Sequence, residues 1–193
     1  EVVFTGGGEP TVHKDYHKIV EYCVDKNFKV QIITNGSKLQ KLVDYLPQEK
    51  IKNINWIGID IDSAVPETYE KIRKSVSACK KGYVCDIKVL MMEENTSEYE
   101  IEQLFRFVKE TGANKLHMRP FCDYENKKVF EVTGQMQTMI EKLSVKYDVK
   151  YSLNLARSTP RTYTKCHQMF LYPIFASNGD ALVCCEGRGQ KQF

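Results

Sequence analysis

Short apolar runs alternate with amphipathic stretches along most of this chain. The apolar runs predict six β-strands, over residues 2–5, 28–34, 54–61, 84–92, 115–119 and 149–153. Apolar positions three and four residues apart predict helices over residues 16–26, 39–46, 97–112 and 135–146, with one more beginning at Pro66. Strands that recur roughly every 25–30 residues with helices between them indicate an α/β fold built on a parallel sheet.

Local signals mark several element ends. Ser97 followed by Glu100 three residues later is typical of a capping box at a helix start, and Gly112 is a helix stop. Pro47 ends the helix predicted before it, and Asn35-Gly36 is a turn signal. These signals support the alternation of strands and helices.

Polar and glycine residues gather where the predicted strands end. Residues 6–10 (GGGEP) follow the first strand, residues 34–36 (TNG) end the second, and Asp60 and Ser63 lie at the end of the third. Arg119 ends the fifth. Right-handed crossovers bring the carboxyl ends of parallel strands to one edge of the sheet, where ligands bind. The pattern therefore predicts a binding pocket at that edge.

The glycine-rich segment after the first strand is not a phosphate-binding loop. It lacks the GK[ST] ending of a P-loop and does not fit GxGxxG. Glycines let the backbone approach a ligand closely, while the carboxylate of Glu9 suits a ligand ammonium and repels a phosphate. Pro10 stiffens the exit from the segment.

Composition narrows the function classes. With 193 residues, 42% of them hydrophobic, the chain can form one domain and a small appendage. A formal charge of +3 with 27% charged residues argues against a nucleic-acid or anionic-membrane surface, and no apolar stretch is long enough for a membrane span. Seven cysteines, an odd number, favour a reducing cytoplasm over a disulfide framework.

Several segments resemble the radical SAM (S-adenosylmethionine) enzymes, in the order that this family has them. Residues 7–10 are identical to the GGEP motif, and residues 33–36 resemble the end of the family's third strand. Residues 59–73 (IDIDSAVPETYEKIR) resemble its fourth strand and the following helix. Residues 88–95 and 117–121 resemble the fifth and sixth strands.

The resemblance implies a site for SAM. Glu9 would hold the amino group of the methionine moiety, Asp60 would accept from the ribose hydroxyls where the family often has serine, and Arg119 would pair with the carboxylate. The full set that the resemblance assigns to SAM is Gly7, Gly8, Glu9, Pro10, Thr34, Asn35, Asp60, Ser63 and Arg119. It assigns no catalytic residue.

Radical SAM chemistry needs three cysteinates, usually spaced CxxxCxxC, to hold a [4Fe–4S] cluster whose electron cleaves SAM to a 5′-deoxyadenosyl radical. This spacing is absent from the sequence, and in the family it lies upstream of GGEP. We therefore expect a piece of a longer protein. Its fold would be a partial (β/α)6 radical SAM barrel without the first strand, with the cluster ligands outside this chain.

The cysteines near the end follow a second pattern. Cys166, twelve residues, Gly179, four residues and Cys184 resemble the opening of the SPASM and twitch auxiliary-cluster modules. Asn178-Gly179 is a tight-turn pair, so a β-hairpin would bring the flanking cysteines together. Cys166, Cys184 and Cys185 are the candidate ligands of an auxiliary [4Fe–4S] cluster, although zinc fits such spacing too.

These expectations combine into one functional hypothesis. Residues 1–155 form the partial barrel and residues 156–193 begin the auxiliary module. The resemblance implies an enzyme that modifies a peptide, a sugar or another small molecule and takes electrons from a donor such as flavodoxin or ferredoxin. Two alternatives stay open: a non-catalytic SAM- or metal-binding remnant, and an unrelated α/β barrel enzyme with a zinc ribbon.

Overall fold

The chain divides into two compact units in a computed structural model. The first unit spans Glu1–Ser158 and the second Thr159–Phe193. The structure describes residues 1–6, 8–61, 70, 72–74, 76–77, 82–123, 128–155, 172–176 and 179–182. No helix within these ranges combines the length and the apolar character needed to cross a membrane.

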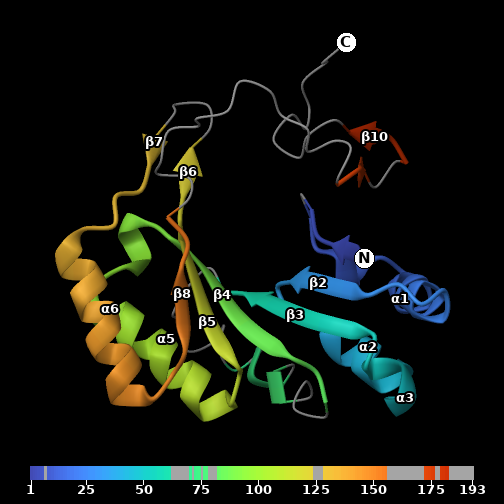
Figure 1. Cartoon of the computed structure of the whole chain (residues 1–193), viewed down its shortest axis with the longest axis horizontal. Helices are drawn as coiled ribbons and strands as arrows, with labels where there is room; N and C mark the ends of the chain where they lie inside the picture. Colours follow the sequence, from blue (N-terminus) through green and yellow to red (C-terminus); the bar gives the residue numbers. More distant parts are fainter. Residues whose placement is uncertain are drawn as a thin grey trace. The chain divides into compact units, whose positions relative to one another are not determined.

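The first unit contains a six-stranded sheet in which every neighbouring pair of strands is parallel (Figure 1). In sheet order, the strands are β1 (Val2–Phe4), β2 (Val30–Thr34), β3 (Ile54–Asp60), β4 (Cys85–Met91), β5 (Lys115–Pro120) and β8 (Tyr151–Leu153). The six predicted strands and the α/β class are confirmed. β2 begins at Val30 rather than at residue 28 because Asn27 adopts a left-handed conformation (φ 60°) that turns the chain just before it.

The helices lie between the strands in sequence. They are α1 (Tyr16–Asp25), α2 (Leu39–Tyr45), α3 (Gln48–Ile51), α5 (Glu98–Thr111) and α6 (Gly134–Tyr147), with one-turn 3-10 helices η1 (Pro10–Val12) and η2 (Glu93–Asn95). Pro47 ends α2 as predicted, but it then caps the short helix α3, which the hydrophobic pattern did not predict. The hairpin of β6 (Cys122–Asp123) and β7 (Lys128–Val129) was also missed, because strands of two residues are too short to show an alternation of apolar and polar positions.

The helix predicted from Pro66 falls largely outside the described residues. Residues 70, 72–74 and 76–77 are helical, in agreement with it. The side chains of Ile72 and Val76 are buried in the core.

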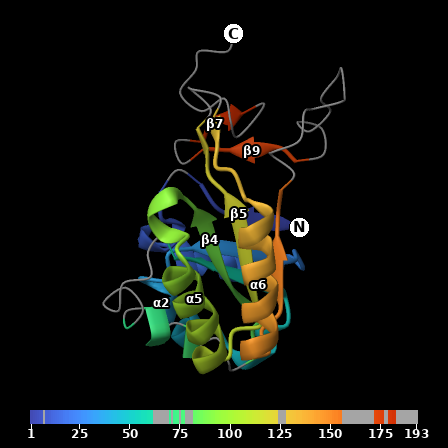
Figure 2. The same cartoon turned by 90° about the vertical axis from the view of Figure 1, so that its left-hand side faces the viewer.

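One face of the sheet packs against the helices and forms the core. Alternate strand residues such as Ile57, Ile59 and Ile87 are fully buried there. The rings of Phe105 on α5 and Tyr151 on β8 meet edge to face, with centroids 6.4 Å apart. Figure 2 shows α5 and α6 running side by side over β4 and β5. Burial of these aliphatic and aromatic side chains is the main stabilising term of the unit.

The intervening strand residues form the opposite face, which carries most of the polar side chains and is called the polar face below. The alternation of side chains along each strand places them there. The residues of this face used below are Trp56, Gly58 and Asp60 on β3, Asp86 and Lys88 on β4, His117 and Arg119 on β5, and Ser152 on β8.

The second unit contains the antiparallel pair β9 (Ile174–Phe175) and β10 (Ala181–Leu182). Gly179 takes a left-handed conformation (φ 91°) in the turn, and the Ala176 amide donates to the Asp180 carbonyl over 2.8 Å. The hairpin predicted from the Asn178-Gly179 pair is thus present. The candidate ligands Cys166, Cys184 and Cys185 lie outside the described residues.

The cap of α5 gives a test of the fold. The hydroxyl of Ser97 accepts from the Glu100 amide over 3.2 Å, as the sequence predicted. We expect Ser97→Ala to lower the free energy of unfolding by about 1 kcal/mol and Ser97→Asp to preserve it. Urea denaturation measures both changes. Thr138→Ala is the control, because this exposed hydroxyl donates only to a carbonyl within α6, that of Gly134. Equal losses in the Ser97→Ala and Thr138→Ala variants would contradict the cap.

Candidate functional site

The carboxylate of Glu9 joins the ends of β1 and β2. Its Oε1 accepts from the Thr11 amide (2.9 Å), the Thr11 hydroxyl (2.5 Å) and the Thr34 hydroxyl (2.6 Å). Its Oε2 accepts from the Asn35 amide (2.6 Å). Glu9 also caps η1, in which Pro10 holds the first position. The orientation of this carboxylate is therefore fixed before any ligand arrives.

The two carboxylate oxygens of Glu9 differ in what they can still accept. A carboxylate oxygen has about two lone-pair positions, and Oε1 already serves three donors. Within the described residues Oε2 serves one donor, which leaves it able to accept from a ligand ammonium.

The turn after β2 is held by its own side chains. The buried Thr34 hydroxyl accepts from the Gly36 amide (3.0 Å), and Asn35 Oδ1 accepts from the Ser37 amide (2.9 Å). Gly36 takes a positive φ of 77°, which glycine adopts at little cost. Thr34 and Asn35 thus shape the site, and Asn35 contacts Glu9 through its backbone amide.

The backbone next to Glu9 has open space at Gly8, and Tyr16 lies close enough to sense the charge of Glu9. A Cβ built on Gly8 would meet nothing within 4 Å, so a ligand can approach the backbone there. The ring of Tyr16 packs against Phe4 beneath the loop, and burial, aided by the charge of Glu9, raises the pKa of the Tyr16 phenol far above its usual value. The phenol therefore stays neutral. Gly7 and Ser63 lie outside the described residues.

Asp60 lies at the end of β3 and forms an ion pair that the sequence analysis missed. Its Oδ1 is 3.1 Å from Nζ of Lys88 on the neighbouring strand. The Lys88 ammonium also lies 5.9 Å from the ring centroid of Trp56. A Cβ on Gly58 would lie 2.5 Å from the Trp56 ring and 2.6 Å from Cδ of Lys88. Glycine at this position therefore leaves room for the Trp56 ring and the Lys88 side chain to lie over β3.

Arg119 is an exposed cation on β5, near its carboxyl end. In the part of the chain that the structure describes, it has no hydrogen-bond or ion-pair partner. A guanidinium is a strong donor to carboxylates, and pairing of Arg119 with a ligand carboxylate stays a prediction.

A second cluster of polar residues on the polar face was not predicted. Asp86 Oδ2 accepts from Trp56 Nε1 (2.5 Å) and lies 2.8 Å from Nε2 of His117. Nδ1 of His117 is 2.6 Å from the Ser152 hydroxyl. The only sequence signal was an aspartate inside a buried apolar strand, and the other members of the cluster lie on three other strands.

The described residues do not provide an iron–sulfur ligand set. Within them, no three or more histidine, cysteine or acidic side chains gather closely enough to hold a metal ion. Cys23, Cys85 and Cys122 are thiols outside any disulfide, and burial raises the pKa of the Cys23 thiol. The candidate cluster ligands near the end of the chain lie outside the described ranges, and none of these three thiols is assigned to a cluster.

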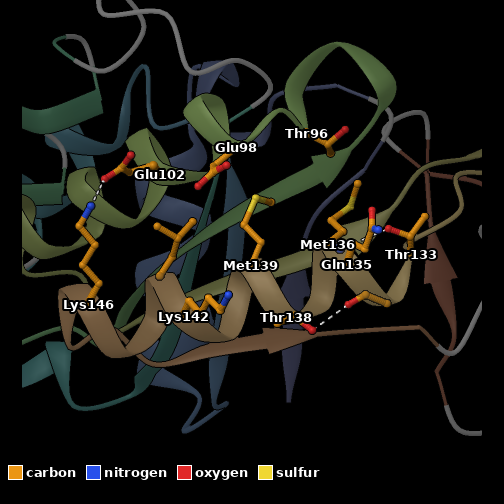
Figure 3. A pocket seen from close by; sticks show the side chains of 12 residues that line it. Thr96, Glu98, Glu102, Thr133, Gln135, Met136, Thr138, Met139, Lys142 and Lys146 are labelled. Atoms are coloured by element: carbon orange, nitrogen blue, oxygen red, sulfur yellow. Dashed lines mark hydrogen bonds and ion pairs between the residues drawn. The ribbon is translucent and has the colours of Figure 1, made fainter.

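An open pocket of about 830 Å³ lies between α5 and α6 (Figure 3). Met136 and Met139 line it, and the carboxylate of Glu102 reaches across to Nζ of Lys146. Lys146 and the Tyr147 hydroxyl lower the pKa of the Glu102 carboxyl. This pocket lies between two helices that cover the sheet, so it differs from the pocket predicted at the carboxyl edge of the strands.

The contact between Gly58, Trp56 and Lys88 gives a second test. Gly58→Ala should lower the free energy of unfolding by about 1–3 kcal/mol, because the added methyl group displaces both side chains. Gly134→Ala is the matched control, since a Cβ there meets nothing within 4 Å. Urea denaturation of both variants checks the difference. A Gly58→Ala variant as stable as the parent would show that the three residues are not in close contact.

Comparison with known proteins agrees with the motifs of the first 82 residues. Residues 1–82 match the family model of the Radical SAM superfamily. The S-adenosylmethionine-dependent nucleotide dehydratase of Selenomonas ruminantium is 44% identical over 62 residues, which are 32% of this chain and 22% of that protein. The Fe-coproporphyrin III synthase of Methanosarcina barkeri is 32% identical over 74 residues, 37% of this chain and 17% of that protein. The chain thus spans about a fifth of each relative's length.

Solved structures share the fold at low sequence identity. Streptococcus suis SuiB bound to precursor peptide SuiA matches with a TM-score of 0.69 at 15% identity, over 97% of this chain and 49% of that chain. A radical SAM methyltransferase from Sphaerobacter thermophilus matches with a TM-score of 0.61 at 12% identity, over 80% of this chain and 50% of that chain. The first 82 residues are thus similar to the Radical SAM superfamily, and the six-stranded parallel sheet of this chain shares the fold of these solved structures.

Proposed function

We propose that the protein containing this chain is a radical SAM enzyme, and that the chain supplies most of its SAM-binding edge. The observation that carries the proposal is the carboxylate of Glu9, which the Thr11, Thr34 and Asn35 donors hold in one orientation. A preoriented acceptor beside an open glycine suits a ligand ammonium, because little conformational freedom of the carboxylate is lost on binding.

Charge supports the assignment of the two ends of the methionine moiety. The ammonium would donate to Oε2 of Glu9, and the carboxylate would pair with the guanidinium of Arg119. Gly8 leaves the space through which the ligand approaches. When SAM and a reduced [4Fe–4S] cluster are both bound, they supply the one-electron cleavage of the sulfonium on which the family's chemistry rests.

Asp60 would accept from the ribose hydroxyls with its charge already offset. The ammonium of Lys88 at 3.1 Å makes the pair neutral as a whole. An aspartate can therefore occupy a position where the family often has serine without leaving an unpaired negative charge beside the ligand.

We also propose that the second unit begins an auxiliary [4Fe–4S] module. The β9–β10 hairpin with its turn at Gly179 supports this, because it has the form expected between Cys166 and Cys184. Cys166, Cys184 and Cys185 are the proposed ligands, with further ligands supplied by other residues of the protein.

The substrate is proposed as a peptide or a small molecule, and the electron donor as flavodoxin or ferredoxin. The named relatives act on different molecules: one is called a nucleotide dehydratase, and SuiB is described as bound to a precursor peptide. The residues of the SAM-binding edge do not choose between these substrates, since they would contact the cofactor.

The proposed activity is tested on the full-length protein. After anaerobic reconstitution with iron and sulfide, dithionite and SAM should yield 5′-deoxyadenosine above a control without enzyme. A reconstituted protein that holds a cluster but forms no 5′-deoxyadenosine would contradict the proposal.

The role of Glu9 gives a sharper prediction. Glu9→Gln removes the charge that attracts the ammonium, so SAM affinity should weaken about ten- to a hundredfold, equivalent to about 1.5–3 kcal/mol. Thr34→Val removes one donor that orients Glu9 and should weaken affinity about threefold to tenfold. Equilibrium dialysis with labelled SAM on the full-length holoenzyme measures both.

Glu1→Gln is the matched control for these variants. Glu1 lies at the other end of β1, where its carboxylate accepts from Nε2 of Gln31 over 2.6 Å. SAM affinity should be unchanged in this variant, and cluster content should be unchanged in all three. If Glu9→Gln binds SAM as tightly as the parent, Glu9 does not hold the ammonium.

The auxiliary cluster predicts a specific loss of iron. A Cys166→Ala, Cys184→Ala double variant of the full-length protein should contain about one cluster less per chain after identical reconstitution. The SAM-induced spectral change of the barrel cluster should remain. Cys23→Ala is the control, since Cys23 is a thiol on α1. Equal iron in double variant and parent would rule out the auxiliary site, and loss of zinc instead would favour a zinc ribbon.

A further inference from the structure

Three side chains from neighbouring strands form a hydrogen-bonded chain on the polar face. Asp86 on β4 bonds to His117 on β5, and His117 bonds to Ser152 on β8, over 2.8 and 2.6 Å. Main-chain pairing fixes this order, because His117 lies directly beside Ser152 in the register of β5 and β8. The three groups are thus placed by the sheet itself.

The donors in the cluster determine the tautomer of His117. Trp56 Nε1 can only donate, and it donates to Oδ2 of Asp86. A carboxylate can only accept, so His117 must carry a hydrogen on Nε2 to bond to the same oxygen. In the neutral imidazole Nδ1 is then an acceptor, and the Ser152 hydroxyl donates its hydrogen to it.

The burial of Asp86 is costly for a purely structural role. Its side chain is 8% exposed, and within the described residues its Oδ1 is buried without a hydrogen-bond partner. A buried carboxylate with one unpaired oxygen contributes less to stability than a well-packed apolar residue would. What the carboxylate does supply is a fixed negative charge next to an imidazole, which stabilises a proton arriving on that ring.

The other two members of the chain are accessible. The side chain of His117 is 33% exposed, and Ser152 is partly exposed. Arg119 and Lys115 each lie two residues from His117 on the same face of β5, and Lys88, which is paired with Asp60, lies directly beside His117 in the register. An electrophile or a ligand hydroxyl at Ser152 would therefore meet positive charge nearby.

We infer that Asp86, His117 and Ser152 form an acid–base site in which His117 takes the hydroxyl proton of Ser152. Its ligands would be molecules with a hydroxyl or an acyl or phosphoryl centre that contact the serine oxygen. The proton moves from Ser152 Oγ to Nδ1 of His117, and the imidazolium keeps its Nε2 hydrogen bond to Asp86. Ser152 Oγ forms a bond to the acyl carbon or the phosphorus of the ligand, the bond from that atom to its leaving group breaks, and the leaving group departs with the bonding electron pair and can take the proton from His117. Serine hydrolases use the two ring nitrogens in the opposite roles, and either nitrogen can carry the proton.

This inference does not depend on SAM binding, so it can be tested separately from the proposed function. The probe is a small alkyl fluorophosphonate, which reacts with activated serine hydroxyls: the Ser152 oxygen bonds to phosphorus, fluoride leaves, and His117 receives the proton. The full chain is incubated with the probe, and mass spectrometry of its peptides locates and times the labelling.

Three variants and a control define the outcome. Labelling should occur at Ser152, be absent in Ser152→Ala, and slow about a hundredfold in His117→Gln and about tenfold or more in Asp86→Asn. Ser144 is the matched control, because its hydroxyl donates to the Val149 carbonyl over 2.8 Å and should remain unlabelled. Trp56, the one tryptophan of the sequence, reports by its emission whether each variant keeps the cluster folded.

Two results would overturn the inference. One is the absence of label on Ser152 in a folded chain. The other is an equal rate of labelling in the parent and in a folded His117→Gln variant, which would leave the three residues as a structural link between β4, β5 and β8. Loss of SAM cleavage in the full-length protein would not bear on either result.

Discussion

Charges on the polar face are placed by the strand register, which pairs each acid with a base on the neighbouring strand. Asp60 lies directly beside Lys88, and the two side chains form an ion pair. Lys88 in turn lies beside His117, whose ring reaches back to Asp86 on β4. Because the helices cover the other face of the sheet, these groups share one surface. A shift of one residue in register would move every one of them to the core side.

The sequence was sufficient for the sheet and for the strand ends at which polar residues gather. The hydrophobic pattern directly predicts the alternation of strands and helices. It also predicts that every second residue of β2 is buried. The polar residues that follow the strands lie close together because the carboxyl ends of parallel strands are all at the same edge of the sheet. This is why Glu9 and Thr34 meet. Family motifs then gave these residues their expected ligand.

The contacts across strands were not predictable in the same way. Lys88, His117 and Ser152 are far apart in sequence, and the resemblance of residues 88–95 and 117–121 to family strands gives Lys88 and His117 no role. Their meeting depends on register, which a single sequence does not specify, and on Gly58, whose lack of a Cβ leaves room for Lys88. The short helix α3 and the β6–β7 hairpin were missed for a simpler reason, since they are too brief to show a period.

Trp56 connects the two parts of the polar face. Its ring lies beneath the ammonium of Lys88, which is paired with Asp60 at the carboxyl end of β3. Its indole nitrogen donates to Asp86, close to the amino end of β4. The edge proposed for SAM and the acid–base cluster are thus joined by direct contacts through one rigid aromatic side chain. Lys88 also lies directly beside His117 in the register of β4 and β5, so the contacts that lead from Asp60 to His117 run through Lys88 as well as through the indole.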